Sequence, residues 1–241
     1  MIGFIWLVAA LIALVVVLAI YIPKIREKAI NLIHPNTLDY STTMTDIPKY
    51  DGKPYVVLND NQPSFTDNEK ADRTAYESYS PLDKYGRCGP ATACLTWELA
   101  PTEPRGEIGQ IKPTGWHTVR YDDLIADKYL YNRCHLIAFC LAGENANERN
   151  LITGTRYLNI EGMLPFETLL AEYVDDHPDS PVLYRVTPIF EGKNLVASGV
   201  EMEAYSLDDD GKSVCFHVYC FNVQPGITIN YATGASQKSA G

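Results

Sequence analysis

Three segments rich in β-branched and aromatic residues constrain the fold more than any other feature of the chain. They span residues 181–186, 195–202 and 214–221, near the C-terminus. Two short polar segments that contain glycine, 191–194 and 208–211, separate them and are typical of turns. Strands joined by short turns pair with their neighbours in sequence. The sequence therefore predicts an antiparallel meander within a central antiparallel β-sheet.

One amphipathic helix is predicted just before these strands, over residues 162–174. Apolar side chains recur there every three or four residues. Pro165 suits the first helical turn, where an N–H group would have no partner. If the helix extends back to Asn159, then Asn159 and Glu167 lie within ~80° of each other around its axis and are expected to face one cavity. With the sheet, this predicts an α+β fold with flanking helices.

An apolar segment without charges occupies residues 2–23. About 20 apolar residues in a helix cross a hydrocarbon core of roughly 30 Å. A cleavable signal peptide is the alternative, but such peptides have a basic start, a shorter apolar run and a small-residue cleavage site. Residues 1–23 are therefore expected to be an uncleaved N-terminal transmembrane helix.

The rest of the chain is expected to hold a linker and one domain. Residues 24–49 mix charged, polar and proline residues with little periodicity, which is typical of a tether. Residues 50–241 are enough for one domain with a substantial core, and they contain no internal repeat.

The formal net charge of −10 excludes a protein that coats nucleic acid by bulk electrostatics, because phosphate binding depends on Lys and Arg. Any contact with nucleic acid must be local. A basic cleft on an acidic body is compatible with the sequence, although roughly half of the basic residues concerned are expected to be ordinary solvated charges. These residues are Arg105, Lys112, Arg120, Lys128, Arg133, Arg149 and Arg156.

The six cysteines leave two interpretations open. Their even number allows three disulfides in an oxidising compartment, with fifteen connectivities. Free buried cysteines are the alternative, since Cys215 and Cys220 lie in an apolar segment. The spacings differ from the CxxC of structural zinc sites, so zinc is not expected.

The residues that carry chemistry begin at residues 131–136, Tyr-Asn-Arg-Cys-His-Leu. Histidine has an unperturbed pKa near ~6.5, so the His135 side chain can act as a base. The oxygens of Asn159 and Glu167 downstream are of the kind that Mg²⁺ prefers. A base with a hard-cation site can hydrolyse a phosphodiester. The other histidines are expected to be surface or satisfied core residues: His34, His117, His177 and His217.

Two short motifs and two single residues carry a resemblance to a known family: residues 132–135 (Asn-Arg-Cys-His), residues 150–156 (Asn-Leu-Ile-Thr-Gly-Thr-Arg), Asn159 and Glu167. With them the chain resembles the DNA/RNA non-specific endonucleases of the ββα-metal fold. The chain is most similar to the membrane-anchored DNA-entry nucleases of Gram-positive bacteria, and the likeness runs from about residue 85 to 231. It implies a Mg²⁺-dependent endonuclease without sequence preference, with Mn²⁺ as a substitute ion. The implied substrate is DNA, with RNA left open, and the implied products carry 5′-phosphates.

The resemblance also assigns roles to individual residues. It implies that His135 is the general base and that Asn159 is the sole direct protein ligand of Mg²⁺. Asn150 and Glu167 are implied to hold the water shell of the metal.

Two arginines and two departures from the family pattern complete the expected site. The resemblance implies that Arg133 lies near the scissile phosphate and that Arg87 stabilises transition-state charge. The commonest family motif is Asp-Arg-Gly-His, and Asn132 and Cys134 replace its first and third residues. Asn132 supplies no carboxylate, and Cys134 adds a side chain where glycine lets backbone approach closely. Neither change removes the base or the ligand, so activity is expected.

The setting implied is a single-pass protein of the cell membrane with an extracellular nuclease domain, acting in DNA uptake (competence) or degradation. The first basic residues, Lys24, Arg26 and Lys28, follow the apolar segment, and by the positive-inside rule they place the domain in the cytoplasm instead. Two alternatives stay open: a membrane-anchored DNA receptor with little cleavage, and a secreted nuclease toxin or scavenger whose leader is removed.

Overall fold

The computed structural model describes residues 38–42 and 47–239. The expected transmembrane helix (1–23) and most of the expected linker lie outside the described residues. Within the described ranges, no helix is both long and apolar enough to cross a membrane. All the described helices and strands belong to one compact unit, Asp39–Gly241.

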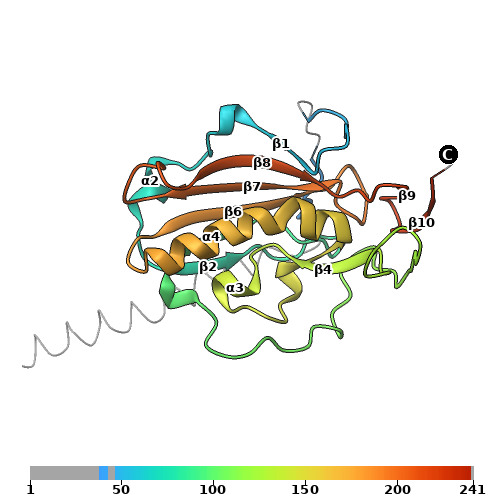
Figure 1. Ribbon diagram of the computed structural model, residues 1–241, viewed down its shortest axis with the longest axis horizontal. Helices are drawn as coiled ribbons and strands as arrows, with labels where there is room; N and C mark the ends of the chain where they lie inside the picture. Colours follow the sequence, from blue (N-terminus) through green and yellow to red (C-terminus); the bar gives the residue numbers. More distant parts are fainter. Residues whose placement is uncertain (1–37, 43–46, 240–241) are drawn as a thin grey trace, which may run out of the picture. The chain divides into compact units, whose positions relative to one another are not determined.

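A six-stranded sheet forms the centre of this unit, and every pair of neighbouring strands in it is antiparallel. The expected α+β fold with a central antiparallel sheet is thus confirmed, as is the meander of the last three long strands (Figure 1). In spatial order the strands are β1 (Tyr55–Val57), β8 (Cys215–Phe221), β7 (Gly199–Ser206), β6 (Val182–Ile189), β3 (Ala91–Leu95) and β2 (Tyr76–Tyr79).

The middle strand of the meander begins later than the sequence predicts. β7 starts at Gly199 rather than at residue 195. The amides of Leu195 and Val196 both donate to the carbonyl of Tyr231, each at 3.0 Å. A partner far along the chain therefore keeps these apolar residues out of the sheet, which overrides their strand propensity.

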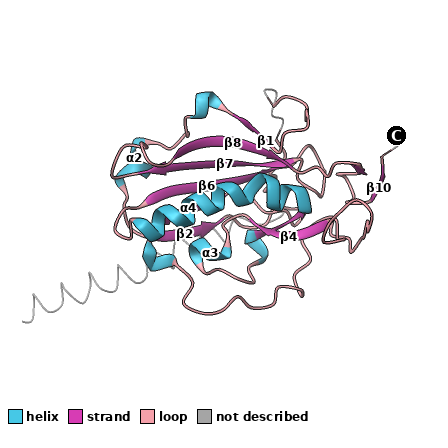
Figure 2. Ribbon diagram, in the orientation of Figure 1, coloured by secondary structure: helices cyan, strands magenta, loops and turns pink. Residues whose placement is uncertain are grey.

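Two helices cover one face of the sheet (Figure 2). The main helix, α4 (Leu164–Asp176), lies along the sheet, and its buried residues Leu170, Tyr173 and Val174 join the main hydrophobic core. Pro165 stands in its first turn, as predicted. The shorter α3 (Phe139–Ala142) contributes Leu141 and Ala142 to the same core.

A π-helical turn, η5 (Leu158–Met163), precedes α4, so helical geometry does reach back to Asn159. Before it, β4 (Tyr131–His135) pairs antiparallel with β5 (Leu151–Thr155). The order strand, strand, helix is that of the expected ββα unit. The remaining elements are short: η2 (Asn59–Asn61), α2 (Asp67–Ala71), η3 (Trp97–Leu99), η4 (Glu148–Asn150), β9 (Ile227–Ile229) and β10 (Ser236–Lys238).

Residues 39–42, which precede the expected boundary at residue 50, contact the domain and lie in the same compact unit. The amide of Thr42 donates to the carbonyl of Phe190 at 2.9 Å, and Asp39 forms an ion pair with Arg87. These contacts attach the segment to loops that lie much later in the chain.

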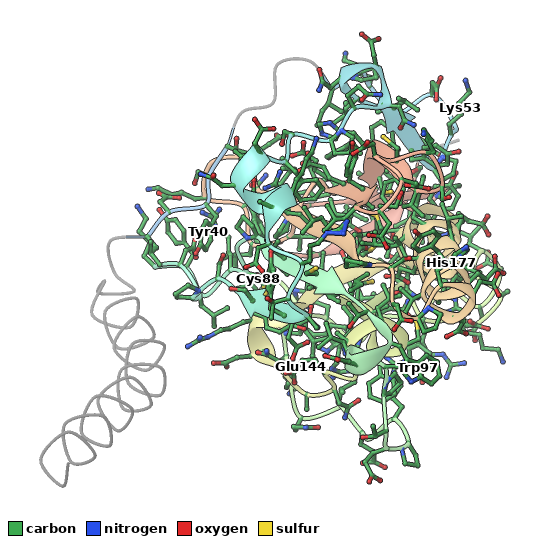
Figure 3. All side chains as sticks on the ribbon, turned by 90° about the vertical axis from the view of Figure 1, so that its left-hand side faces the viewer. Tyr40, Lys53, Cys88, Trp97, Glu144 and His177 are labelled. Atoms are coloured by element: carbon green, nitrogen blue, oxygen red, sulfur yellow. The ribbon has the colours of Figure 1, made fainter. Side chains whose placement is uncertain are left out.

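All six cysteines are free thiols. Four of them are buried, as the second interpretation expects, whereas Cys215 is half-buried and Cys140 is exposed. Cys88 is labelled among the packed side chains of Figure 3, and only 3% of its surface is exposed. Burial raises the pKa of the Cys88 thiol to about 12, so this thiol stays protonated at neutral pH.

Candidate active site

A cleft of about 760 Å³ brings together residues from β4, from the η5–α4 helix and from the loop before β4. Its polar and charged lining includes most of the residues singled out in the sequence. They are Arg105, Asn132, Arg133, His135, Arg156, Asn159 and Glu167.

His135 ends β4 and is held in one tautomer. Only 7% of its surface is exposed, and its Nε2 lies 2.8 Å from the carbonyl oxygen of Asn145. A carbonyl can only accept a hydrogen bond, so Nε2 carries the proton and Nδ1 of the neutral ring keeps a free lone pair. Desolvation lowers the pKa of His135, which favours this neutral form.

Asn150 fixes the backbone that follows His135 and does not reach the cleft. Its Oδ1 accepts from the amides of Leu136 (3.1 Å) and Ile137 (2.8 Å), and its Nδ2 donates to the carbonyl of Ile137 (3.0 Å). The side chain is completely buried. The structure therefore does not bring Asn150, which the resemblance assigns to the water shell of the metal, into the cleft lining. The Asn150 amide is instead committed to the turn after β4.

Asn159 and Glu167 line the same cleft as His135, as the helical spacing predicts. The start of their helix is fixed by polar contacts: the amide of Leu158 donates to Thr155 Oγ1 at 2.9 Å, and the amide of Tyr157 donates to Gln224 Oε1 at 3.1 Å. These anchors place the π-helical turn, and π-helical turns are frequent at functional sites.

Glu167 and Asn159 suit a divalent cation. Desolvation raises the pKa of Glu167 to about 8, and the nearby charge that opposes this shift is that of Arg105. A carboxyl group held in a dry environment gains a counter-charge when a cation binds beside it. Asn159 lines the same cleft, and its amide oxygen is of the kind that Mg²⁺ prefers.

Arg133 is oriented along the cleft wall. Its Nη2 donates to the carbonyl of Gly109 at 2.9 Å and its Nε to the carbonyl of Ile111, while the guanidinium lies 4.1 Å from the centre of the Trp116 ring. Neutral partners hold this arginine, so its positive charge remains available to an anion in the cleft.

The cleft is locally basic, as the sequence allows. Arg105, Arg133 and Arg156 all line it, and Glu167 is the single acidic residue among the lining side chains. Arg156 forms an ion pair with Asp127, which offsets part of its charge. A phosphate can therefore be attracted locally despite the net charge of −10.

Arg87, to which the resemblance assigns a catalytic role, does not line this cleft. The side chain is fully buried. It donates to Asp83 and Asp39 at 2.8 Å each, and also to the hydroxyl of Ser41 and the carbonyls of Gly192 and Asn194. All of its donors are used within the fold, so Arg87 joins segments of the domain.

The two departures from the family motif have different positions. Asn132 lines the cleft, whereas Cys134 is completely buried in the core. A Cβ at Gly154, on the facing strand, would come within 2.3 Å of the Cys134 sulfur. Gly154 thus makes the space that the Cys134 side chain fills, and Cys134 adds nothing to the cleft itself.

Some cleft residues carry no recognisable signal in the sequence. Asn145 acts through a backbone carbonyl, which any residue provides. Trp116 and Tyr129 line the cleft from segments outside the helices and strands, where the sequence has no periodicity. In the sequence, the one sign that these two residues belong to a nucleic-acid site is that they are aromatic and lie among basic residues.

A second cluster of ionisable side chains, Glu201, Glu203 and His217, has its potential ligand atoms within 4.8 Å of one another. Burial opposes charge on His217, but its hydrogen bonds to Glu201 and to the carbonyl of Gln62 raise its pKa. Glu203 accepts from Ser64 and Arg185. These hydrogen bonds satisfy the three side chains within the fold, and their spacing could also hold a metal ion. His217 is a satisfied core histidine, as expected.

Known proteins resemble the chain over most of the domain. NucA from Streptococcus agalactiae, solved with a magnesium ion bound, is 28% identical, with a TM-score of 0.66 over 76% of this chain and 87% of NucA. Sda1 nuclease, solved with a bound zinc ion, shares the fold at 23% identity, with a TM-score of 0.64 over 78% of this chain and 97% of Sda1.

A curated relative and a family model extend this comparison. A deoxyribonuclease from Streptococcus dysgalactiae subsp. equisimilis is 31% identical over 112 residues, which are 45% of this chain and 33% of that relative. The chain thus spans about a third of its length. The model of the DNA/RNA non-specific endonuclease family matches residues 66–207, more than half of the chain. The chain therefore belongs to the DNA/RNA non-specific endonuclease family, whose members hydrolyse phosphodiester bonds.

Proposed function

We propose that the chain is an endonuclease that hydrolyses phosphodiester bonds of DNA without sequence preference and uses Mg²⁺. One observation carries the proposal: His135, with a free lone pair on Nδ1, lines the same cleft as Asn159 and Glu167. NucA, to which the chain is similar, was solved with magnesium, and a shorter match is to a deoxyribonuclease.

His135 acts as the general base in this proposal. Nδ1 takes a proton from a water molecule as its oxygen attacks phosphorus, and the bond from phosphorus to the 3′ oxygen breaks. The 3′ oxygen leaves and gains a proton from solvent, so the phosphate stays on the 5′ side. The carbonyl of Asn145 stabilises the imidazolium that forms, because both ring nitrogens then donate.

Asn159 and Glu167 are the residues that would hold the cation, Asn159 directly and Glu167 through water. When bound, a divalent cation neutralises negative charge that develops on the phosphate oxygens. Arg133 adds a positive charge in the same cleft, and its bonds to two carbonyl groups hold the guanidinium in place.

The proposed lack of sequence preference follows from contacts between arginines of the cleft and phosphates of the nucleic acid. Arg105, Arg133 and Arg156 offer charge to phosphates, and contacts to phosphate carry no sequence information. RNA has the same linkage, so RNA stays within the proposed substrate range.

We also propose that the nuclease acts at the cell surface, in DNA uptake or degradation, with residues 2–23 as its anchor. The support is the uncharged apolar segment itself. Membrane fractionation of cells that produce the chain, followed by protease treatment of intact cells, tests this. A domain that is protected in intact cells and digested only after lysis would overturn the surface location.

The decisive assay is digestion of plasmid DNA and of RNA by the full chain with Mg²⁺ and with EDTA. We expect cleavage with Mg²⁺ only, and products that accept a 5′ label only after phosphatase treatment. His135→Ala should reduce cleavage by ~10²–10⁴-fold, the usual contribution of general base catalysis. His117→Ala, at an exposed histidine outside the cleft lining, is the matched control. Tight DNA binding without cleavage by the wild type would favour the receptor alternative instead.

A further inference from the structure

Tyr129 is a large aromatic residue that remains exposed at the end of the cleft. Its exposed fraction is 46%, and it is one of the residues that line the cleft. Folding normally buries aromatic surface, and a single exposed aromatic ring needs no special explanation by itself. Its position on a rigid loop beside the candidate active site is what requires one.

The loop that carries Tyr129 is firmly anchored. Tyr121, Ile125 and Leu130 are buried in a small core of their own. The amide of Tyr121 donates to the carbonyl of Lys128 at 2.8 Å, and the amide of Leu130 donates to the carbonyl of Val119 at 3.1 Å. The loop could therefore bury Tyr129 only by breaking these contacts. Because the loop is already ordered, a ligand that binds the Tyr129 ring does not have to pay the entropy of ordering the loop.

Two further features hold the ring in place. Lys128, just before it, has a φ of +70°, a left-handed conformation that is unusual for a residue other than glycine. Arg120 forms a β-bridge with Tyr129, and its guanidinium carbon lies 5.3 Å from the centre of the Tyr129 ring. Asp122 in turn holds the Arg120 guanidinium at 3.1 and 3.3 Å.

Tyr129 also lies close in sequence to β4, the strand that carries His135. Tyr129 lies two residues before β4 (Tyr131–His135), and Tyr131, Asn132, Arg133 and His135 of that strand line the cleft together with it. An extended chain spans ~3.3 Å per residue, so the six steps from Tyr129 to His135 correspond to at most roughly 20 Å. A nucleic acid strand with its phosphate at His135 can thus extend over Arg133 to Tyr129.

We propose that Tyr129 is a stacking platform for one unpaired nucleobase, a subsite that makes the enzyme favour single-stranded nucleic acid. This rests on the proposed function, because it assumes that the cleft binds a polynucleotide. An aromatic ring and a guanidinium are the groups on which proteins stack bases without reading their sequence. In a duplex the bases already stack on one another, so a base is free for Tyr129 only in a single strand, a loop or a frayed end.

The test measures binding of the full chain in EDTA, where no cleavage occurs, by fluorescence anisotropy. Two labelled oligonucleotides of equal length are compared, one with normal bases and one with abasic sugar-phosphate units only. Tyr129→Ala should weaken binding of the normal oligonucleotide about 5- to 100-fold, the range for loss of one stacked base, and leave the abasic one unchanged. Tyr129→Phe keeps the ring and should bind as the wild type does.

Trp97→Ala is the matched control, because Trp97 is 56% exposed and does not line the cleft; Figure 3 labels it at the edge of the molecule. It should bind both oligonucleotides normally. Equal losses on normal and abasic oligonucleotides for Tyr129→Ala, or no loss on either, would overturn the stacking subsite.

Cleavage assays separate this proposal from the function on which it rests. Tyr129→Ala should raise KM for single-stranded DNA far more than for duplex DNA and leave kcat nearly unchanged, because the ring is remote from the reacting phosphate. Wild-type protein that cleaves nothing would refute the proposed function. Wild-type protein that cleaves, with a Tyr129→Ala variant that raises both KM values equally, would refute only the stacking subsite.

Discussion

At the scale of single residues, the environment of His135 sets the pH range in which the cleft can work. Catalysis requires neutral imidazole, and desolvation lowers the pKa of His135. Activity should therefore persist below pH ~6.5, the ordinary histidine pKa, and be lost only as pH falls through the lowered value. A profile of kcat/KM against pH measures this. Glu167 in the same cleft has a pKa raised to about 8, so the profile is compared with that of Glu167→Gln. An acidic limb centred at or above pH 6.5 in both proteins would contradict the buried, neutral base.

Asn159 provides a second prediction at this scale. Changing Asn159→Ala should lower kcat strongly and alter DNA binding in EDTA little, because a cation held there acts mainly on the transition state. Single-turnover cleavage and anisotropy measure the two effects separately. Asn132→Ala is a useful comparison, since Asn132 lines the same cleft but is assigned no metal. Equal losses of binding and turnover in Asn159→Ala would argue against a metal ligand.

At the scale of elements, the β4–β5 hairpin depends on a complementary pair, Cys134 and Gly154. A methyl group at Gly154 would meet the Cys134 sulfur at 2.3 Å, so Gly154→Ala should destabilise the domain by about 1–3 kcal/mol through overpacking. Adding Cys134→Gly removes the sulfur and should recover much of the loss. Urea denaturation of the two single variants and the double variant measures this coupling. Strictly additive losses would show that the two residues do not share one space.

The elements also show how far sequence patterns reach. Local patterns are enough for the β6–β8 meander and for α4, where neighbours in sequence are neighbours in space. They are insufficient for the start of β7, because the partner of Leu195 is Tyr231, and for β3, which pairs with β6 from far along the chain. The π-helical turn is likewise invisible to a 3.6-residue period, although it still directs Asn159 into the cleft.

At the scale of the whole molecule, the sequence predicts those residues of the candidate site that act through their side chains and belong to a motif with a fixed spacing. His135, Arg133, Asn159 and Glu167 do come together in one cleft. Asn150 and Arg87 show the limit, because an amide or guanidinium that could serve a substrate can equally satisfy buried backbone or carboxylate groups. Only the three-dimensional neighbours of such a residue decide between these uses.

Arg87 provides the last prediction, which concerns the integrity of the whole domain. It joins the segment at Asp39, the turn at Asp83 and the loop at Gly192, and its side chain is fully buried. Arg87→Ala leaves the buried Asp83 carboxylate without its partner and should destabilise the domain by about 3–5 kcal/mol. Thermal unfolding measures this loss.

The control is Arg73→Ala, which breaks an exposed ion pair with Asp208 and should cost at most about 1 kcal/mol. Below its unfolding transition, the Arg87→Ala variant should keep a kcat close to that of the wild type, because the buried guanidinium does not line the cleft. A folded Arg87→Ala variant with normal thermal stability and lost turnover would reverse this conclusion, since it would assign to Arg87 the catalytic role that the geometry denies it.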